Sequence, residues 1–315
     1  MKIAITGASG FIGTEVLKQF DRTADVEVIA LTRTEIQNDT PGNAQEDICM
    51  QFQLATNQRN PVWVQTDYSV SSLQEIFQGI DAVIHLAAVR GTSGSISDYH
   101  INETLTENVL IAMGEAQVKH IVYASSIAVY SDTAQIPWKE DSIIEPKTLY
   151  GITKAACEYL CKYYSKKYGF TYSLVRIAQL LGLGERKKLM MNVFINLAYK
   201  QEQLRVIGKS IAKRQYIDVQ DLAEILIKLA TASHRECATI NAGMEAAYGN
   251  LEIAELVNQI FENDTPIAYD NSIPESIESS QMDIQVLKKS LAYTPFDMKQ
   301  SLKRIREEML LDLKK

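Results

Sequence analysis

The chain has 315 residues, of which 46% are hydrophobic and 23% are charged. These fractions are ordinary for a folded globular protein, and they exclude an intrinsically disordered chain. The formal net charge is −7 and the Lys and Arg residues are scattered, which argues against nucleic-acid binding. A strand pattern directly follows Met1, with no signal peptide, and no apolar run reaches the length of a membrane span. We therefore expect a cytoplasmic protein without a membrane partner.

The chain begins with MKIAITGASGFIG, in which a short apolar strand at 3–6 leads into three glycines and a helix pattern at 11–20. Gly7 would allow a tight turn, Gly10 would let the backbone approach a pyrophosphate, and Gly13 would let the helix pack closely on the strand. The N-terminus of the helix would face the anion. The segment predicts a phosphate-binding turn, although a glycine trio can also have a purely steric origin.

Strand and helix patterns alternate along the first half of the chain. The expected strands lie at 3–6, 26–31, 62–65, 82–86, 120–124 and 172–176, and the expected helices at 11–20, 71–78, 101–117 and 150–168. This alternation predicts an α/β protein with a doubly wound parallel sheet. Residues 36–61 lack periodicity, and no role is assigned to them.

The regular alternation ends after Arg176. Helix patterns near 190–201 and 251–262, with a terminal amphipathic helix within 301–315, predict a smaller and mostly helical C-terminal lobe. The expected division is a dinucleotide-binding domain at 1–176, to which the chain returns near 214–241, and a substrate-binding lobe at 177–213 and 242–315.

A hydroxyl, a phenol and an ammonium group stand at a suggestive spacing. Tyr150 and Lys154 are four residues apart, so on a helix they share one face, and Ser126 follows the expected strand at 120–124. Together these groups can move a proton at a sugar hydroxyl while a hydride moves to nicotinamide. A free tyrosine has a pKa of about 10, so a nearby lysine and a nicotinamide cation would have to favour the phenolate. We predict that these three residues are catalytic.

These motifs resemble the extended short-chain dehydrogenase/reductase family, over nearly the whole chain. The resemblance is carried by TGASGFIG at 6–13, HLAA at 85–88, SSIAVY at 125–130, YGITK at 150–154, VRIAQLLG at 175–182, RQYIDVQD at 214–221 and INAG at 240–243, with Asp67 and Asn102. It implies a Rossmann-type fold. Within the family, the chain looks most similar to nucleotide-sugar epimerases, dehydratases and 4-keto reductases, including UDP-N-acetylglucosamine and UDP-glucose 4-epimerases.

The same resemblance implies roles for individual residues. Asp67 is expected to contact the adenine amino group, and Ala87 and Ala88 to line the dinucleotide. Asn102 is expected to join a strand and a helix, while His85 shapes the wall of the cofactor site without titrating. The residues expected to bind the cofactor are Gly7, Gly10, Phe11, Ile12, Gly13, Thr32, Arg33, Asp67, Tyr68, Leu86, Ala87, Ala88, Tyr150 and Lys154.

The end of the second expected strand bears on the choice of cofactor. NAD-binding chains carry an acidic residue there for the adenosine ribose, whereas this sequence has Thr32 followed by Arg33. A hydroxyl and a guanidinium suit the 2′-phosphate of NADP, which we therefore expect as the cofactor. Alternatively, Arg33 is only solvated and Glu35 serves the ribose, so NAD stays possible.

The substrate residues follow from the resemblance and include one departure from it. Arg214 matches the arginine that grips a nucleotide-sugar pyrophosphate, while Asp218 and Asp221 are as readily capping groups. Many relatives have a second arginine within the segment that matches 271–282, which here has none. Arg186, Lys187 or Lys188 could compensate, or this basic cluster is only a solvated loop. The residues expected to bind substrate are Arg90, Ser126, Gln179 and Arg214.

These observations predict NADPH-dependent 4-keto reduction of a nucleotide-linked sugar. The alternative is a nucleotide-sugar 4-epimerase that retains NAD, since both reactions use the same Ser126, Tyr150 and Lys154. Two further alternatives are reduction of a small carbonyl without a nucleotide and a non-catalytic dinucleotide sensor. The intact catalytic set argues against a sensor.

Two expectations concern the cysteines and the assembly of the chain. The four cysteines, at 49, 157, 161 and 237, have no metal-binding or redox spacing, so we expect neither a metal nor a disulfide. We expect a two-fold homodimer through the helices at 101–117 and 150–168. The apolar residues assigned to that contact are Leu105, Val109, Ala112, Ala156 and Leu160.

Overall fold

The computed structural model describes residues 1–20, 26–33, 61–91, 93–130, 135–185, 189–208, 210–272 and 278–312. The chain forms two compact units. The first unit consists of Met1–Tyr130, Ile144–Arg176 and Leu222–Ile240, and the second unit consists of Ser131–Ile143, Ile177–Asp221 and Asn241–Lys315. Glu35, Cys49, most of the aperiodic stretch at 36–61 and the basic cluster at 186–188 lie outside the described residues.

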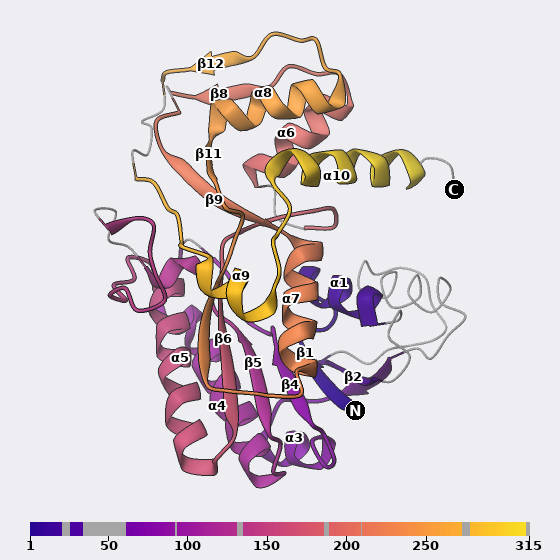
Figure 1. The fold of residues 1–315 in the computed structure, drawn as a ribbon, viewed down its shortest axis with the longest axis vertical. Helices are drawn as coiled ribbons and strands as arrows, with labels where there is room; N and C mark the ends of the chain where they lie inside the picture. Colours follow the sequence, from indigo (N-terminus) through magenta and orange to yellow (C-terminus); the bar gives the residue numbers. More distant parts are fainter. Residues whose placement is uncertain are drawn as a thin grey trace. The chain divides into compact units, whose positions relative to one another are not determined.

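A seven-stranded sheet lies at the centre of the first unit (Figure 1). Its strands are β1 (Lys2–Thr6), β2 (Glu27–Thr32), β3 (Val62–Gln65), β4 (Ala82–His85), β5 (His120–Ala124), β6 (Thr171–Ile177) and β10 (Ala238–Ala242). Their order is β10-β6-β5-β4-β1-β2-β3, and every pairing from β3 to β6 is parallel. The order reverses beside β1, which is the signature of a doubly wound, Rossmann-type sheet. The fold prediction is therefore confirmed.

Side-chain caps and a left-handed glycine mark the ends of some of the helices that connect the strands. The connecting helices are α1 (Phe11–Phe20), α3 (Val70–Ile76), α4 (His100–Glu115) and α5 (Leu149–Tyr168), with the short 3₁₀ turns η1 (Ile96–Asp98) and η2 (Ile127–Val129). Ser69 caps α3 and Thr148 caps α5, each through its side-chain oxygen. Helix α5 ends at Gly169, whose φ of 81° is left-handed.

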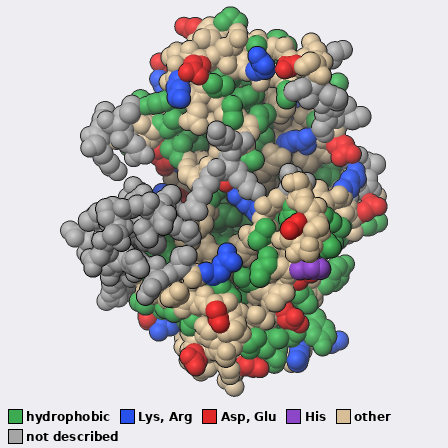
Figure 2. All heavy atoms as spheres, turned by 180° about the vertical axis from the view of Figure 1, so that it is seen from behind, with side chains coloured by type: hydrophobic (Ala, Val, Ile, Leu, Met, Phe, Trp, Pro, Cys, Tyr) green, Lys and Arg blue, Asp and Glu red, His purple; other side chains and the backbone are tan. Residues whose placement is uncertain are grey.

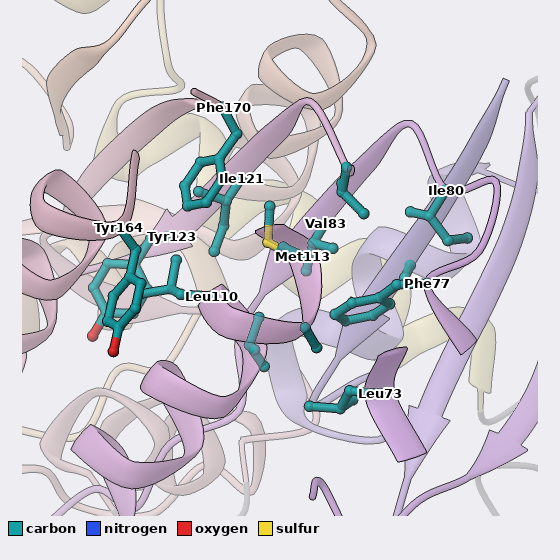
Figure 3. Close-up of a cluster of buried hydrophobic side chains, with 14 of the residues drawn as sticks. Leu73, Phe77, Ile80, Val83, Leu110, Met113, Ile121, Tyr123, Tyr164 and Phe170 are labelled. Carbon is teal, nitrogen blue, oxygen red and sulfur yellow. The ribbon is translucent and has the colours of Figure 1, made fainter. Parts of the chain in front are cut away.

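One hydrophobic core of the first unit fills the space between the sheet and the helices α3, α4 and α5 (Figure 3). Phe77, Val83, Met113 and Ile121 are all fully buried there. The same core also contains Leu105, Val109 and Ala112. The assignment of these three residues to a dimer contact was wrong, because they already pack inside the subunit.

The second unit mixes short strands with helices. Its strands β7 (Gln179–Leu181), β9 (Lys213–Asp218) and β11 (Ala247–Gly249) form one sheet, and β8 (Arg205–Ile207) pairs with β12 (Ala268–Asp270). Its helices are α6 (Met190–Tyr199), α8 (Asn250–Phe261), α9 (Gln285–Leu291) and α10 (Met298–Asp312). The helices expected near 190–201 and 251–262 are confirmed. The prediction of a mostly helical lobe was wrong, because the lobe mixes strands with helices. Most of its strands have only three residues, which is too short to show an alternating pattern in the sequence.

The C-terminal helix α10 is tied to the end of β9 by a buried carboxylate. Arg304 makes a bidentate ion pair with Asp218, with contacts of 2.9 to 3.1 Å, and Asp218 is fully buried. Asp218 also accepts the backbone N–H of Gln220. At the start of α7 (Val219–Thr231), Asp221 accepts the hydroxyl of Tyr293. Asp218 therefore caps α7, as the capping interpretation expects, whereas Asp221 accepts hydrogen bonds from the segment that precedes α10.

On the face drawn in Figure 2, basic side chains lie as separate spots among acidic ones. Within the described ranges, no helix combines the length and the apolar character needed to cross a bilayer. Among the side chains that the structure describes, no group of three could hold a metal ion. Cys157 and Cys161 are buried free thiols, and Cys237 is an exposed one.

Candidate active site

The glycine turn between β1 and α1 leaves no room for side chains. Gly7 has a φ of +67°, and a Cβ on it would lie 2.8 Å from the amide nitrogen of Ala87. A Cβ on Gly13 would lie 2.5 Å from the carbonyl oxygens of both Gly7 and Ala8. Gly13 therefore allows the helix to pack on the turn itself. The bare backbone at the N-terminus of α1, which begins with Phe11 and Ile12, is a cradle that fits a pyrophosphate.

Buried hydrogen bonds hold the end of β4 against the glycine turn. The Thr6 hydroxyl accepts the backbone N–H groups of Leu86 and Ala87 at 3.1 and 3.2 Å, and it lies 2.6 Å from Nδ1 of His85. The other ring nitrogen of His85 lies 3.1 Å from the Thr106 hydroxyl. Burial lowers the pKa of His85 to about 3. His85 is thus a neutral structural group, as expected.

Asn102 of α4 fastens the segment that follows β4. Its side-chain oxygen accepts the backbone N–H of Val89 at 2.7 Å, and its Nδ2 donates to the Val89 carbonyl at 3.0 Å. Nδ2 also donates to the Thr153 hydroxyl of α5. The expectation that Asn102 joins a strand end to a helix is confirmed. The contact orders the backbone at Ala88 and Arg90.

The residues predicted for the adenosine end lie at the carboxyl ends of β2 and β3. Thr32 is buried at 6% exposure, whereas the neighbouring Arg33 is exposed. Asp67 is exposed and accepts the backbone N–H of Ser69, which lowers the pKa of its carboxyl group. The hydroxyl of the buried Tyr68 donates to the Leu31 carbonyl at 3.3 Å. Among the residues that the structure describes at this edge, Arg33 is therefore an exposed cation.

Ser126, Tyr150 and Lys154 come together beside the end of β5. The Ser126 hydroxyl accepts the N–H of Ala128 at the start of η2, and it lies close enough to the Tyr150 phenol to lower the pKa of that phenol. Lys154 lies one turn beyond Tyr150 on the same face of α5 and is 3% exposed. Its Nζ donates to the Ala124 carbonyl at 2.7 Å and lies 5.9 Å from the centre of the Tyr150 ring. The predicted catalytic set is one cluster in this structure.

Burial and charge act in opposite directions on this cluster. Burial raises the pKa of Tyr150 to about 12, while the charge of Arg90 and the hydrogen bond from Ser126 lower it. Burial also lowers the pKa of Lys154 to about 8. We expected Lys154 to favour the phenolate, but the basic group that opposes the rise here is Arg90. The Lys154 ammonium is instead directed at a backbone carbonyl.

The remaining predicted substrate residues lie in the second unit. Arg214 of β9 donates to the Glu278 carbonyl at 3.2 Å, and Gln179 is an exposed residue at the start of β7. The two strands pair in parallel, with Gln179 opposite Tyr216. The structure therefore brings Gln179 and Arg214 to neighbouring strands of one sheet. Arg90 lies in the first unit, as Ser126 and Tyr150 do.

A buried ion pair that the sequence did not predict lies beside the cluster of Ser126, Tyr150 and Lys154. Glu158 and Arg176 are 0% and 2% exposed, and their side chains meet at 2.8 and 3.0 Å. A signal was present, because Arg176 interrupts an apolar strand and Glu158 stands one turn beyond Lys154 on a buried helix face. A charge in each of two buried patterns indicates a pair.

A doubly wound sheet with a glycine turn and a Ser-Tyr-Lys cluster at its carboxyl edge is the architecture of enzymes that use a nicotinamide dinucleotide. The chain belongs to the NAD dependent epimerase/dehydratase family, which it matches over residues 3–243. It is accordingly an enzyme of that family that acts on nucleotide sugars.

Individual relatives sharpen this assignment. The structure of UDP-N-acetylglucosamine 4-epimerase from Bacillus cereus superposes with a TM-score of 0.83 at 32% sequence identity, covering 98% of this chain and 99% of that chain. A putative UDP-glucose 4-epimerase of Methanocaldococcus jannaschii is 26% identical, over 96% of each chain. The GDP-mannose 3,5-epimerase of Arabidopsis thaliana is 25% identical, over 94% of this chain and 78% of its own. These relatives favour epimerisation over the reduction that we expected first.

Proposed function

We propose that this chain is a nucleotide-sugar 4-epimerase that acts on a UDP-hexose or UDP-N-acetylhexosamine and retains NAD through its catalytic cycle. The observation that carries the proposal is the full-length similarity to a UDP-N-acetylglucosamine 4-epimerase. The cluster of Ser126, Tyr150 and Lys154 supports it, because it provides the groups that the reaction needs. A sensor without catalysis would not need such a cluster.

Each residue of the cluster has a distinct part in this proposal. Tyr150 takes the proton of the sugar 4-hydroxyl and returns it to the 4-keto oxygen when the hydride is returned to the opposite face of C4. Ser126 hydrogen-bonds the same oxygen, and Lys154 holds the nicotinamide ribose. The nicotinamide ring, when bound, accepts and returns the hydride at C4. Arg90 favours the Tyr150 phenolate through its charge.

The first unit is proposed to bind the cofactor and the second unit to bind the nucleotide sugar. The glycine turn would hold the pyrophosphate, Asp67 the adenine amino group, and Ala87 and Ala88 the wall beside it. Arg214 would grip the pyrophosphate of the substrate. Gln179 would contact the sugar.

A second candidate function is NADPH-dependent 4-keto reduction, and one observation favours it. Arg33 is the exposed cation at the end of β2, where a guanidinium suits the 2′-phosphate of NADP. Thr32 is buried, so that contact is assigned to Arg33 and not to Thr32. A reductase would consume one NADPH for each product molecule.

We also propose a homodimer in the cytoplasm, on a corrected set of contact residues. The exposed apolar side chains of α5 are Ile152, Tyr159 and Tyr163, which recur at helical spacing, and Ile101 of α4 is 43% exposed. Two copies of this face would bury it around a two-fold axis. A monomeric mass by light scattering at micromolar concentration would contradict the dimer.

The test of the proposed function uses the purified protein without added cofactor. Incubation with UDP-N-acetylglucosamine or UDP-glucose is expected to give the 4-epimer, detected by NMR, with no net absorbance change at 340 nm. Denaturation should release NAD. Absence of turnover without added NADPH, together with stoichiometric NADPH consumption by a 4-keto sugar, would establish the reductase instead.

A further inference from the structure

Glu158 and Arg176 form a buried ion pair in the first unit. Arg176 donates from Nε and from one terminal nitrogen to the two carboxylate oxygens of Glu158, at 3.0 and 2.8 Å. Removing two charges from water is costly, and apolar residues of the same size often give equal stability. The pairing with Glu158 keeps the pKa of Arg176 raised despite its burial. Such a pair therefore invites an explanation other than stability.

Both members of the pair reach the segment that carries Ser126. The Ser125 hydroxyl donates to a carboxylate oxygen of Glu158 at 2.6 Å. Arg176 donates to the Tyr130 hydroxyl, and its guanidinium lies 4.8 Å from the centre of the Tyr130 ring. Ser125 precedes Ser126, and Tyr130 directly follows η2, which Ser126 caps. The pair therefore holds this segment at both of its ends.

The same pair is fixed to the helix that carries the other two catalytic residues. Glu158 lies one turn beyond Lys154 and two turns beyond Tyr150 on α5. Arg176 lies on β6, next to Val175, whose carbonyl accepts the N–H of Ser125 at 2.8 Å. One carboxylate thus connects α5 with the end of β5.

We propose that Glu158 and Arg176 are positioning residues, which fix the place of Ser126 relative to Tyr150 by joining α5 to the segment 125–130. This inference rests on the proposed function for its kinetic consequence. The contacts that hold the segment exist without substrate, so their effect on Tyr150 can be measured independently of any activity.

The test removes one hydrogen bond to the ion pair at a time and leaves the ion pair itself intact. Ser125→Ala deletes the hydroxyl on Glu158, and Tyr130→Phe deletes the hydroxyl on Arg176 while keeping the ring beneath the guanidinium. The matched control is Ser165→Ala. It also removes a buried serine hydroxyl bond from the first unit, to the Phe170 carbonyl, at the far end of α5.

Two measurements decide the inference. The ¹³Cζ resonance of Tyr150, assigned by its loss in Tyr150→Phe, reports the hydrogen bond of its phenol with no substrate present. We expect it to shift in Ser125→Ala and Tyr130→Phe but not in Ser165→Ala. In turnover, kcat should fall about 3- to 10-fold in the first two variants with KM unchanged, as expected for lost alignment of one hydrogen bond.

The outcomes separate this inference from the proposed function. A Tyr150 resonance that stays in place in both test variants overturns the positioning role, whatever the activity. A shifted resonance in a protein that turns over no nucleotide sugar supports the positioning role and overturns the proposed function. Melting temperatures of the three variants identify any that fails to fold, and the remaining test variant then decides.

Discussion

The two units hold their candidate site residues in different ways. In the first unit, Lys154 is 3% exposed and Ser126 is held through η2, with a buried ion pair behind both. In the second unit, Gln179 is exposed and Arg214 is half-buried, and the Arg214 side chain donates to the Glu278 backbone carbonyl. Chemistry requires fixed geometry, whereas recognition of a nucleotide sugar tolerates adjustable side chains. The difference suggests that changes in the first unit affect kcat and changes in the second affect KM.

Tyr150→Phe should have the largest effect on turnover. It removes the proton-transfer group and nothing else, so kcat should fall about 100-fold or more while cofactor binding stays nearly intact. Steady-state kinetics and the amount of bound dinucleotide per chain provide the check. Residual activity within a few-fold of the unmodified enzyme would assign the proton transfer elsewhere.

Acid should destabilise the first unit through two buried histidines. Burial lowers the pKa of His85 to about 3 and that of His120 to about 4, against 6.5 in an unfolded chain. Between these values the unfolded state binds more protons, so stability falls as pH drops below about 6.5. Each histidine contributes up to about 1.4 kcal/mol per pH unit. Urea unfolding at pH 7 and pH 5.5 measures this loss, and equal midpoints would contradict it.

Arg33→Asp tests whether the exposed cation at the end of β2 recognises a 2′-phosphate. Loss of one charge-assisted phosphate contact should weaken NADPH binding by about 1.5 to 3 kcal/mol and change NADH binding little. Titration of both dinucleotides into the cofactor-free protein gives the two dissociation constants. An unchanged NADPH constant would show that Arg33 is only solvated.

Gly7→Ala and Gly79→Ala separate close approach from backbone strain. Both glycines have a left-handed φ, of +67° and +72°, but a Cβ on Gly79 would meet nothing within 4 Å. Gly79→Ala should cost about 1 kcal/mol from strain alone, and Gly7→Ala about 1 to 2 kcal/mol more, with loss of bound cofactor. Thermal unfolding and cofactor content check both. Equal losses of stability in the two variants would show that a close contact with Ala87 does not add to the cost at Gly7.

Arg214→Ala tests whether the second unit binds the substrate. If the guanidinium binds the substrate pyrophosphate, KM should rise about 10-fold with kcat little changed. Arg205→Ala is the matched control, since Arg205 is an exposed arginine on β8 whose ion pair with Asp270 spans 3.7 Å. A fall in kcat without a change in KM would move Arg214 into the chemical step.

Much of the first unit could be predicted from the sequence because backbone geometry demands particular residues there. The glycine spacing, the pairing of Tyr150 with Lys154 and the alternation of strands all follow from fixed periods. The second unit was described less well, since β7, β8, β11 and β12 are too short to alternate. The ion pair of Glu158 and Arg176 depends on contacts between distant segments, which no local pattern shows. The direction of Lys154 toward Ala124 likewise follows from tertiary packing.

The fate of a deuterium label at C4 of UDP-N-acetylglucosamine tests the central claim most directly. Epimerisation with a retained dinucleotide removes the label from C4 and returns it to C4 on the other face. The account predicts a 4-epimer that keeps its deuterium at C4, without added cofactor and independently of added unlabelled NADH. Loss of the label to solvent or to the added dinucleotide, or a product unchanged at C4, would contradict the account.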